Sequence, residues 1–256
     1  MQQILNLFRR GAPVKRPVGM PPCGIPRPCD RLRVVFPSST APSPVSSPAP
    51  AANGDVFLAL LTVLANAIEA RNAYASGHTR RVGAFARAAA HRLGFGEPAL
   101  RAVELGSVLH DIGEIGIPDR ILTKPGPLTP EEEEQVMRHP SIGARLLRSV
   151  PELEHLVPFV LHHHERFDGT GYPHGLAENA IPLGARLLAV ADAFDAMTTD
   201  RPYRTRLSPA TAIAELADGA GGQFDPGVVD ALVQAYQAGE LDPVLGLSRA
   251  GAAVAD

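Results

Sequence analysis

Apolar residues recur at intervals of three and four along most of the chain after about residue 55. In HTRRVGAFARAAAHRLGF, the positions Val82, Phe85, Ala86, Ala89 and Leu93 fall on one face of a helix. We see no run of alternating apolar and polar residues that predicts a strand of any length. The pattern therefore predicts an all-α fold, a helical bundle in a single domain that spans residues 55–245.

Two segments carry signals for the start of a helix. In LTPEEEEQVM, Thr129 is a candidate N-cap, Pro130 stands at the first helical position, and Glu132 closes a capping box. Asp55 precedes the apolar run VFLALLTVLANAI and is a candidate N-cap for it. Apolar positions in this second helix extend around more of its surface than one buried face requires. That excess indicates a homodimer surface on the helix of residues 55–69.

The ends of the chain differ from the middle. Residues 1–54 are rich in Pro, Ser and Ala, as in PSSTAPSPVSSPAPAANG, and lack a repeating apolar face. We expect them to form a disordered low-complexity tail, which serves as a tether or has no function, and residues 246–256 to form a flexible C-terminus. A sensor domain does not fit into 54 residues, so regulatory input is expected from partner proteins or from the tail.

Composition excludes several classes of protein. The 256 residues are 45% hydrophobic, enough for a packed core, and their net charge of -3 argues against binding to a DNA or RNA duplex. Only two cysteines occur, which is too few for a disulfide framework, and the absence of CxxC spacing argues against a structural zinc site. The apolar run from Val56 to Ile68 is short for a membrane span, and the N-terminus lacks the order of a secretory signal. We expect a soluble, cytoplasmic protein.

Several histidines and carboxylates fall on the inward faces of the predicted helices. His78 lies four residues before Val82, and His163 lies three residues after Val160. A single histidine in such a place is usually a hydrogen-bonded core residue, but buried carboxylates cost free energy unless they are paired or bound to metal. The side chains with this placement are His78, His110, Asp111, His163, His164, Asp192 and Asp195.

This set of side chains predicts a metal centre. Nitrogen and oxygen ligands without thiolate suit iron, manganese, zinc or nickel. Asp111, flanked by histidines from several helices, suits two cations that it bridges. Such a pair lowers the pKa of a bridging water and holds a phosphoryl oxygen for in-line attack. Hydrolysis of a phosphoester is therefore the first chemical hypothesis.

Two further segments fit that hypothesis, although each is a weak signal alone. DGTGYP, residues 168–173, is a turn-rich loop of a kind that also occurs on ordinary surfaces. In TTDRPYRTRLS, Arg201 and Arg204 follow the helix of Asp192 and suit bidentate contacts to phosphate. An ordinary basic turn exposed to solvent would have the same sequence pattern.

The motifs HDIG, HHERFDGTGYP and DRPYR, in this order, resemble the HD-GYP subgroup of the HD-domain phosphohydrolases. The resemblance extends from about residue 72 to residue 225. It implies an all-α bundle that hydrolyses cyclic di-GMP to the linear dinucleotide pGpG and in some members on to GMP. It also implies a cyclic dinucleotide as the substrate and two divalent metal ions, iron or manganese, as cofactors.

The resemblance assigns roles to individual residues. Asp111 would bridge the metals, Glu114 and Asp195 are the further carboxylates placed in the catalytic set, and Asp195 and Glu165 would orient ligand histidines. Arg201 and Arg204 would hold the substrate, and Gly171, Tyr172 and Pro173 would line its pocket. The implied metal ligands are His78, His110, Asp111, His139, His163, His164 and Asp192. Of these, only His139 rests on the resemblance alone.

The chain departs from the family pattern at two positions. Some members hold a third metal with a glutamate four residues before the first histidine, where this chain has Tyr74, so we expect two metals. The family pattern HDIGK has a lysine that reaches the scissile phosphate, and this chain has Glu114 there. Loss of such a contact costs about 3 kcal/mol of transition-state stabilisation, and an anion in its place adds repulsion.

Three hypotheses about the function follow from these observations. The first is an active phosphodiesterase for cyclic di-GMP or a related cyclic dinucleotide. The second is a ligand-binding or interaction protein with weak or no turnover, because of Glu114. The third is an HD hydrolase of another nucleotide or phosphate ester, against which the GYP loop and the RPYR segment argue.

Overall fold

The computed structural model describes residues 51–71, 77–200 and 205–247, with side chains from residue 56 onward. This part of the chain folds into helices and contains no strand, which confirms the all-α prediction. The predicted tail and C-terminus lie outside it except for residues 51–54, 246 and 247. The helices are α2 (Ala51–Glu69), α3 (His78–Arg92), α4 (Glu97–Leu109), η1 (Ile112–Gly116), α5 (Asp119–Leu122), α6 (Pro130–Val136), α7 (His139–Leu147), η2 (Pro151–Leu156), α8 (Val157–His162), η3 (Glu178–Ala180), α9 (Leu183–Thr198), α10 (Pro209–Asp218), α11 (Pro226–Gln237) and α12 (Asp242–Leu245).

One of the two predicted helix starts is confirmed. Helix α6 begins at Pro130; the Thr129 hydroxyl accepts the N–H of Glu132, and the Glu132 carboxylate accepts the N–H of Thr129 at 2.8 Å. Helix α2 begins at Ala51, four residues before the predicted start, so the prediction of Asp55 as its N-cap is wrong. A helix start depends on which backbone N–H groups find acceptors, and a cap residue in the sequence does not decide this alone.

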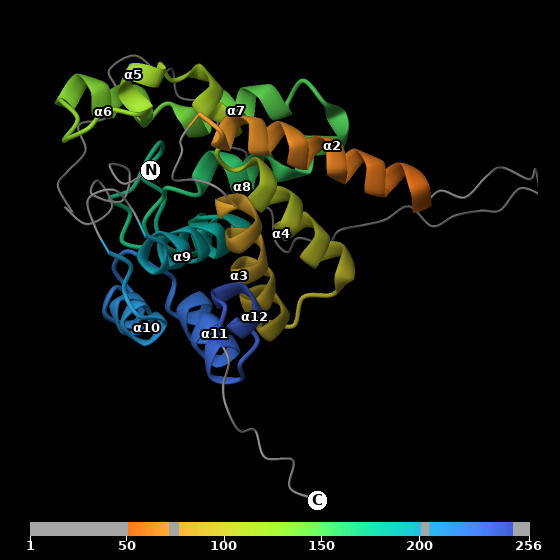
Figure 1. Ribbon diagram of the computed structural model, residues 1–256, viewed down its shortest axis with the longest axis vertical. Coiled ribbons are helices and arrows are strands. Elements are labelled where there is room, and N and C mark those ends of the chain that lie inside the picture. Colours follow the sequence, from red (N-terminus) through yellow and green to blue (C-terminus); the bar gives the residue numbers. More distant parts are fainter. Residues whose placement is uncertain (1–50, 72–76, 201–204, 248–256) are drawn as a thin grey trace, which may run out of the picture.

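Helix α9 is the centre of the larger hydrophobic core. Every residue from Gly184 to Met197 except Arg186 is buried, and the helix contacts α3, α4, α8, α10 and α11 (Figure 1). The predicted stripe on α3 faces this core, with Val82, Phe85, Ala86 and Ala89 buried. Leu93 does not follow the stripe and is 38% exposed, because the helix ends at Arg92 before it.

A second core lies between α7, α8, η1, η2 and the end of α2. The two cores meet along α4, which gives Val103 to the first and Leu109 to the second. His110 and Asp111 follow directly after α4, so the chain delivers them to the junction between the two cores.

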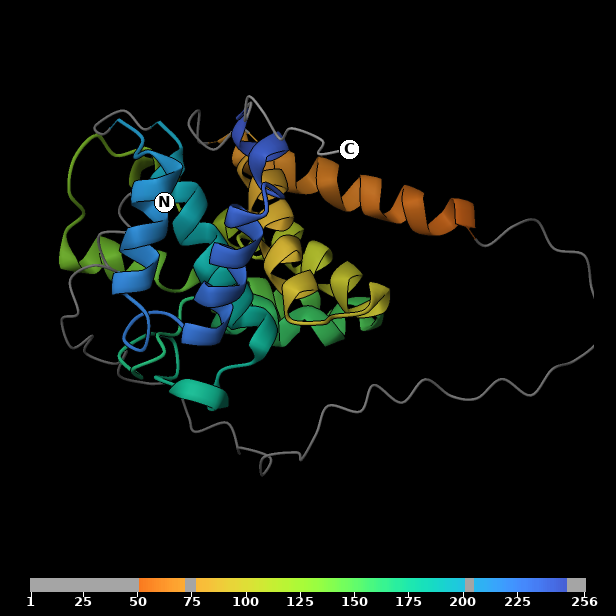
Figure 2. The same cartoon turned by 90° about the horizontal axis from the view of Figure 1, so that it is seen from below.

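Helix α2 extends past the bundle toward its N-terminal end (Figure 2). Its last turns are packed, with Ala65 and Ile68 buried, whereas Val56, Leu60 and Val63 are 58%, 63% and 65% exposed. This confirms that its apolar positions exceed one buried face. Within the described residues, no helix is long and apolar enough to cross a membrane.

Candidate metal centre

The predicted ligands come together at the junction of the two cores. Four of the five histidines stand at helix ends: His78 and His139 are the first residues of α3 and α7, and His110 and His163 directly follow α4 and α8. A helix end lets a side chain reach past its own helix toward a shared point. All seven predicted ligands are buried except Asp111, which is partly exposed.

Asp111 lies between two groups of ligand atoms and belongs to both. Its Oδ2 lies 3.2 Å from His110 Nε2 and 4.0 Å from His78 Nε2, while its Oδ1 lies 3.2 Å from His139 Nε2 and 3.6 Å from His163 Nε2. We call the first set the His78 group (His78, His110, Asp111) and the second the His139 group (Asp111, His139, His163, His164). A carboxylate with one oxygen toward each group has the geometry of a bridging ligand.

Three of the imidazoles are oriented by their own helices. The Nδ1 atoms of His110, His139 and His163 lie 2.7 Å, 2.8 Å and 2.7 Å from the carbonyl oxygens of Ser107, Val136 and Val160, each three residues earlier. A carbonyl only accepts, so Nδ1 carries the proton and Nε2 is left as the ligand atom.

The Nε2 atoms converge closely enough to share a cation. His78 and His110 are 3.4 Å apart at Nε2, His139 and His163 are 3.3 Å apart, and His139 and His164 are 3.2 Å apart. Nitrogen lone pairs that face one another at these distances repel unless a proton or a metal ion lies between them. The donor set therefore fits divalent metal ions with a preference for imidazole and carboxylate.

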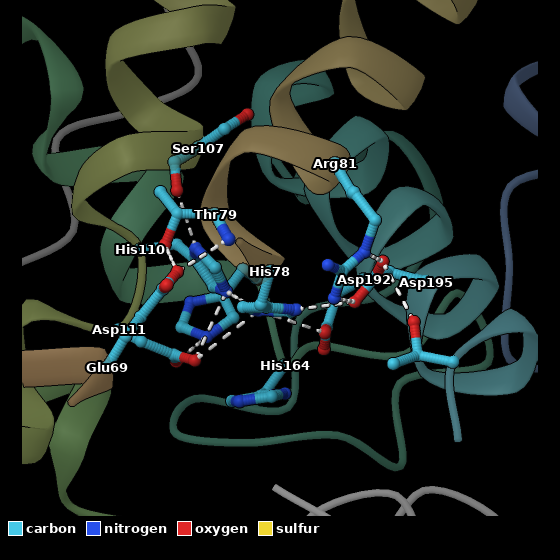
Figure 3. A network of polar contacts seen from close by, with 12 residues as sticks. Glu69, His78, Thr79, Arg81, Ser107, His110, Asp111, His164, Asp192 and Asp195 are labelled. Carbon is cyan, nitrogen blue, oxygen red and sulfur yellow. Dashed lines mark hydrogen bonds and ion pairs between the residues drawn. The ribbon is translucent and has the colours of Figure 1, made fainter. Parts of the chain in front are cut away.

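His78 is oriented from a distant helix. Its Nδ1 lies 2.8 Å from Asp195 Oδ2 on α9, and the same carboxylate accepts hydrogen bonds from Arg81 (Figure 3). Asp195 thus orients the ring of His78, one of the predicted ligands. Burial opposes its charge, but the hydrogen bonds from His78 and Arg81 lower the pKa of Asp195 below its usual value.

Asp192, one helical turn before Asp195 on α9, also faces the His78 group. Its Oδ1 lies 3.7 Å from His78 Nε2, is buried, and has no hydrogen-bond partner among the described residues. A buried carboxylate oxygen without a donor is costly, and a metal ion at the His78 group would satisfy it.

The electrostatic field of the centre favours positive charge. Burial opposes the charged form of His110, but Asp111 and Asp192 outweigh burial and raise the pKa of His110 to about 10. Burial likewise opposes the charge of Asp111, yet the neighbouring His110, His139 and His163 hold its pKa well below the usual range. A divalent cation at this place would balance the negative charge of Asp111 and Asp192 as a proton on His110 does, and its binding would release that proton.

Glu114 lies in η1, three residues after Asp111, and is 5% exposed. Its Oε1 is buried without a hydrogen-bond partner among the described residues. Burial, together with the negative charge of Asp111, raises the pKa of Glu114. Depending on pH, the side chain is thus a neutral acid or an anion whose burial costs free energy. Its carboxylate makes none of the contacts that define the two groups.

The GYP loop covers the His139 group. The ring of Tyr172 is buried and stacked on that of His164 with centroids 5.0 Å apart. A Cβ at Gly171 would lie 2.3 Å from Arg166 N and 2.6 Å from His164 O, so only glycine fits there. The Tyr172–Pro173 peptide bond is cis. The loop therefore lies against the His139 group.

Glu165 has a different role from the predicted one. Its two carboxylate oxygens accept the backbone N–H groups of His174 at 2.8 Å and Leu176 at 3.1 Å. It therefore holds the chain that follows the GYP loop and does not orient a ligand histidine. With His162 and His174 it forms a separate group away from the seven ligands, in agreement with the placement of His162 outside the centre.

Some predicted residues lie outside the described part of the chain. Arg201 and Arg204, the predicted substrate ligands, and Tyr74 are among them. The sequence reasoning missed Gly113, whose added Cβ would lie 1.9 Å from His139 O. This contact packs η1 backbone to backbone on α7 and so brings Asp111 to His139. The glycine of HDIG was the available signal.

Comparisons with known proteins agree with this geometry. A family model described as HD domain matches residues 62–228. The cyclic di-GMP phosphodiesterase response regulator RpfG of Xanthomonas campestris is 44% identical over 176 residues, which cover 68% of this chain and 47% of that protein. A cyclic di-GMP phosphodiesterase of Thermotoga maritima is 41% identical over 182 residues, which cover 70% and 50%. A 3'3'-cGAMP-specific phosphodiesterase of Vibrio cholerae is 36% identical over 173 residues, which cover 67% and 33%.

The chain thus spans half or less of the length of these relatives. Among solved structures, a cyclic GMP-AMP specific phosphodiesterase of V. cholerae superposes with a TM-score of 0.60 at 18% identity, over 74% of this chain and 50% of that one. At that identity the likeness supports the fold alone. Together with the motifs and the grouped ligands, the family match shows that the chain belongs to the HD-domain family, and within it to the HD-GYP subgroup.

Proposed function

We propose that this chain is a metal-dependent phosphodiesterase that hydrolyses cyclic di-GMP to pGpG, with GMP as the product of any second cleavage. The observation that carries the proposal is the shared carboxylate of Asp111, which faces one group of histidine ligands with each oxygen. The two groups are suited to two metal ions, iron or manganese, with Asp192 completing the His78 group and His164 the His139 group. The names of the relatives support the substrate class.

The metal ions, when bound, would lower the pKa of an attacking water and stabilise negative charge on the phosphoryl oxygens. The residues of the chain have supporting tasks. Asp195 and the carbonyls of Ser107, Val136 and Val160 fix the imidazoles, so no reorganisation is needed during the reaction. In the overall reaction a P–O bond to water forms, the bond to one ribose oxygen breaks, and that oxygen takes up a proton.

The substrate contacts belong to the proposal as well. Arg201 and Arg204 would bind the phosphates of the cyclic dinucleotide. Gly171, Tyr172 and Pro173 would line its pocket beside His164, which Tyr172 covers. The relative from V. cholerae named for 3'3'-cGAMP makes a second cyclic dinucleotide worth testing beside cyclic di-GMP.

A second candidate function is suggested by Glu114. Its buried carboxylate near Asp111 repels a phosphodiester whenever it is ionised. In this alternative the chain binds a cyclic dinucleotide and turns it over weakly or not at all. Glu114→Lys distinguishes the two functions, because a lysine restores a cation and should raise turnover if Glu114 is what limits it.

The test is product analysis on the metal-loaded protein. Protein purified without oxygen and supplied with Fe²⁺ or Mn²⁺ is incubated with cyclic di-GMP, 3'3'-cGAMP or a mononucleotide, and pGpG and GMP are quantified. Formation of pGpG, lost on removal of metal, supports the phosphodiesterase. Binding of cyclic di-GMP without pGpG supports the binding protein, and faster turnover of a mononucleotide supports a hydrolase of another nucleotide.

The association state and location are proposed on separate grounds. Exposed apolar side chains at Val56, Leu60 and Val63 support a homodimer through the helix of residues 55–69. Light scattering of the wild type beside Leu60→Glu would show a dimer converted to a monomer. Signalling partner proteins and a cytoplasmic location remain predictions from the sequence.

A further inference from the structure

The C-terminal end of α2 contacts helix α3, which begins with His78, and helix η1, which directly follows Asp111. Glu69 is the last residue of the helix, and Arg71 follows two residues later. Neither is a predicted ligand, and neither takes part in the function proposed above. Their hydrogen bonds reach α3 on one side and η1 on the other.

Glu69 caps helix α3 from outside. The first turn of a helix leaves backbone N–H groups without partners inside the helix, and Gly77, the residue before His78, offers no side-chain cap. The Glu69 carboxylate accepts the N–H of Gly77 at 3.2 Å and the N–H of Thr79 at 2.6 Å, and it accepts the Thr79 hydroxyl as well. His78 therefore lies between two residues that one carboxylate holds.

The contact lies opposite the one that orients the His78 ring. Asp195 and Arg81 bind the side chain of His78 from α9 and α3, whereas Glu69 binds the backbone on either side of it (Figure 3). A negative charge at a helix N-terminus also stabilises the helix by its interaction with the helix dipole. Glu69 thus sets where α3 begins and so where His78 stands.

Arg71 holds the segment that follows Asp111. Its guanidinium donates to the carbonyl of Glu114 at 2.7 Å, to the carbonyl of Ile117 at 2.6 Å, and to the carboxylate of Asp119 at 2.6 Å and 2.8 Å. Three acceptors around one planar group fix the turn of η1 firmly. Because η1 begins at Ile112, this turn sets the position of Asp111.

We infer that Glu69 and Arg71 are positioning residues for the metal centre, Glu69 through His78 and Arg71 through Asp111. The inference rests on the metal centre of the proposed function but not on its substrate. It predicts that the two residues affect the two groups of ligands differently, which a purely structural role would not produce. Glu69 acts on a residue of the His78 group alone, whereas Arg71 acts on the carboxylate that both groups share.

The experiment is a manganese titration of full-length protein stripped with a chelator. Binding is followed by equilibrium dialysis at a temperature where circular dichroism shows every variant folded. Glu69→Gln is expected to weaken one of the two equivalents about tenfold to a hundredfold and to leave the other unchanged. Arg71→Ala is expected to weaken both. Thr79→Val, which removes only the hydroxyl, should weaken the same equivalent as Glu69→Gln by less.

Matched controls come from an ion pair between α3 and α4, in which Arg87 also contacts Glu104 at 3.1 Å. Arg87 and Glu97, with nitrogen and oxygen 2.8 Å apart, contact no ligand. Glu97→Gln and Arg87→Ala make the same changes of charge and should bind manganese within about twofold of the wild type.

The inference is overturned if the variants melt earlier yet bind manganese as the wild type does. It is also overturned if Glu69→Gln weakens both equivalents equally, because that pattern is general loosening. A wild type that binds no manganese refutes the centre and this inference together. Normal manganese binding without hydrolysis of cyclic di-GMP refutes only the proposed activity.

Discussion

The two groups of the metal centre are held in place by different kinds of contact. In the His139 group, His139 and His163 are oriented by carbonyls three residues earlier in the chain, at 2.8 Å and 2.7 Å. In the His78 group, His110 is oriented in the same local way, but His78 depends on Asp195, 117 residues away. The backbone around His78 depends in turn on Glu69.

The difference indicates which part of the centre is sensitive to change elsewhere. A contact three residues away forms whenever the helix end forms, so the His139 group is set by local folding and by the contact of Gly113 with α7. The His78 group requires α2, α3 and α9 to pack correctly against one another. We therefore expect perturbations distant from the centre to weaken the His78 group first.

The largest effect is expected from removing the residue that both groups share. Asp111→Asn keeps the size of the side chain but removes the charge that attracts both cations. We expect loss of both metal equivalents and a fall in turnover of about 10²- to 10³-fold or more. Metal analysis and product assays measure this, with Asp230→Asn on the exposed face of α11 as the control. Retention of one tight equivalent would show that the two groups do not depend on a common bridge.

A smaller and selective effect is expected from Asp195→Asn. The amide cannot accept from His78 and Arg81 as the carboxylate does, so the His78 ring loses its orientation. One metal equivalent should weaken about tenfold to a hundredfold while the other is retained. Calorimetric titration with manganese resolves the two equivalents. Equal weakening of both would remove the distinction between the groups.

Glu114 gives a prediction that depends on pH. Because burial and Asp111 raise its pKa, Glu114 is neutral at low pH and becomes an anion as the pH rises through that raised pKa. Repulsion of a phosphodiester therefore appears only toward high pH. Glu114→Gln should match the wild type in kcat/KM at pH values below the raised pKa of Glu114 and exceed it by about tenfold at pH values above it, which corresponds to about 1.4 kcal/mol. A ratio that stays constant between these values would show that the carboxylate does not face the substrate.

The same shift affects stability. A group whose folded pKa is raised contributes stability that is complete below its unfolded pKa and is lost as the pH rises through the folded pKa. Replacement by glutamine removes this loss. The Glu114→Gln variant should therefore melt higher than the wild type at pH values above the raised pKa of Glu114, with the gain shrinking as the pH falls below it. Thermal melts of metal-free protein across this range measure it.

The smallest effect is expected at Tyr172. Its hydroxyl is buried and has no hydrogen-bond partner in the ranges that the structure describes, so its removal costs no bond there. Tyr172→Phe keeps the stacking on His164 and should change the free energy of unfolding by less than about 1 kcal/mol. Manganese binding by the His139 group should also be unchanged. A loss of turnover with normal stability would mean that the hydroxyl contacts the substrate.

Much of the centre could be predicted because its ligands extend local helical patterns. His78, His163 and Asp192 continue apolar stripes, and a stripe that is buried carries its polar members inward with it. His139 opens α7 directly after Arg138 and has no preceding stripe in its own helix, so only the family motif revealed it. The helical class followed from the same periodicity.

The contacts that the sequence did not reveal join residues from different elements. Glu165 was expected to orient a histidine, but it holds the chain after the GYP loop, nine and eleven residues away. Likewise, nothing in the residues around Glu69 or Arg71 predicts which backbone groups they will meet. Such contacts arise from packing, which periodicity does not describe.

Helix α2 is packed only near its C-terminal end, next to the metal centre, and its longer N-terminal part is exposed. Its 19 residues span about 28 Å, and the packed part that ends in Glu69 is about one turn, or 5 Å. If the helix pivots as a rigid body about its packed last turns, a 3 Å shift of the exposed outer end moves the inner end by about 0.7 Å. That is about the tolerance within which a catalytic site must be held. Binding of a partner to the exposed part of α2 would thus shift the position of His78 through Glu69.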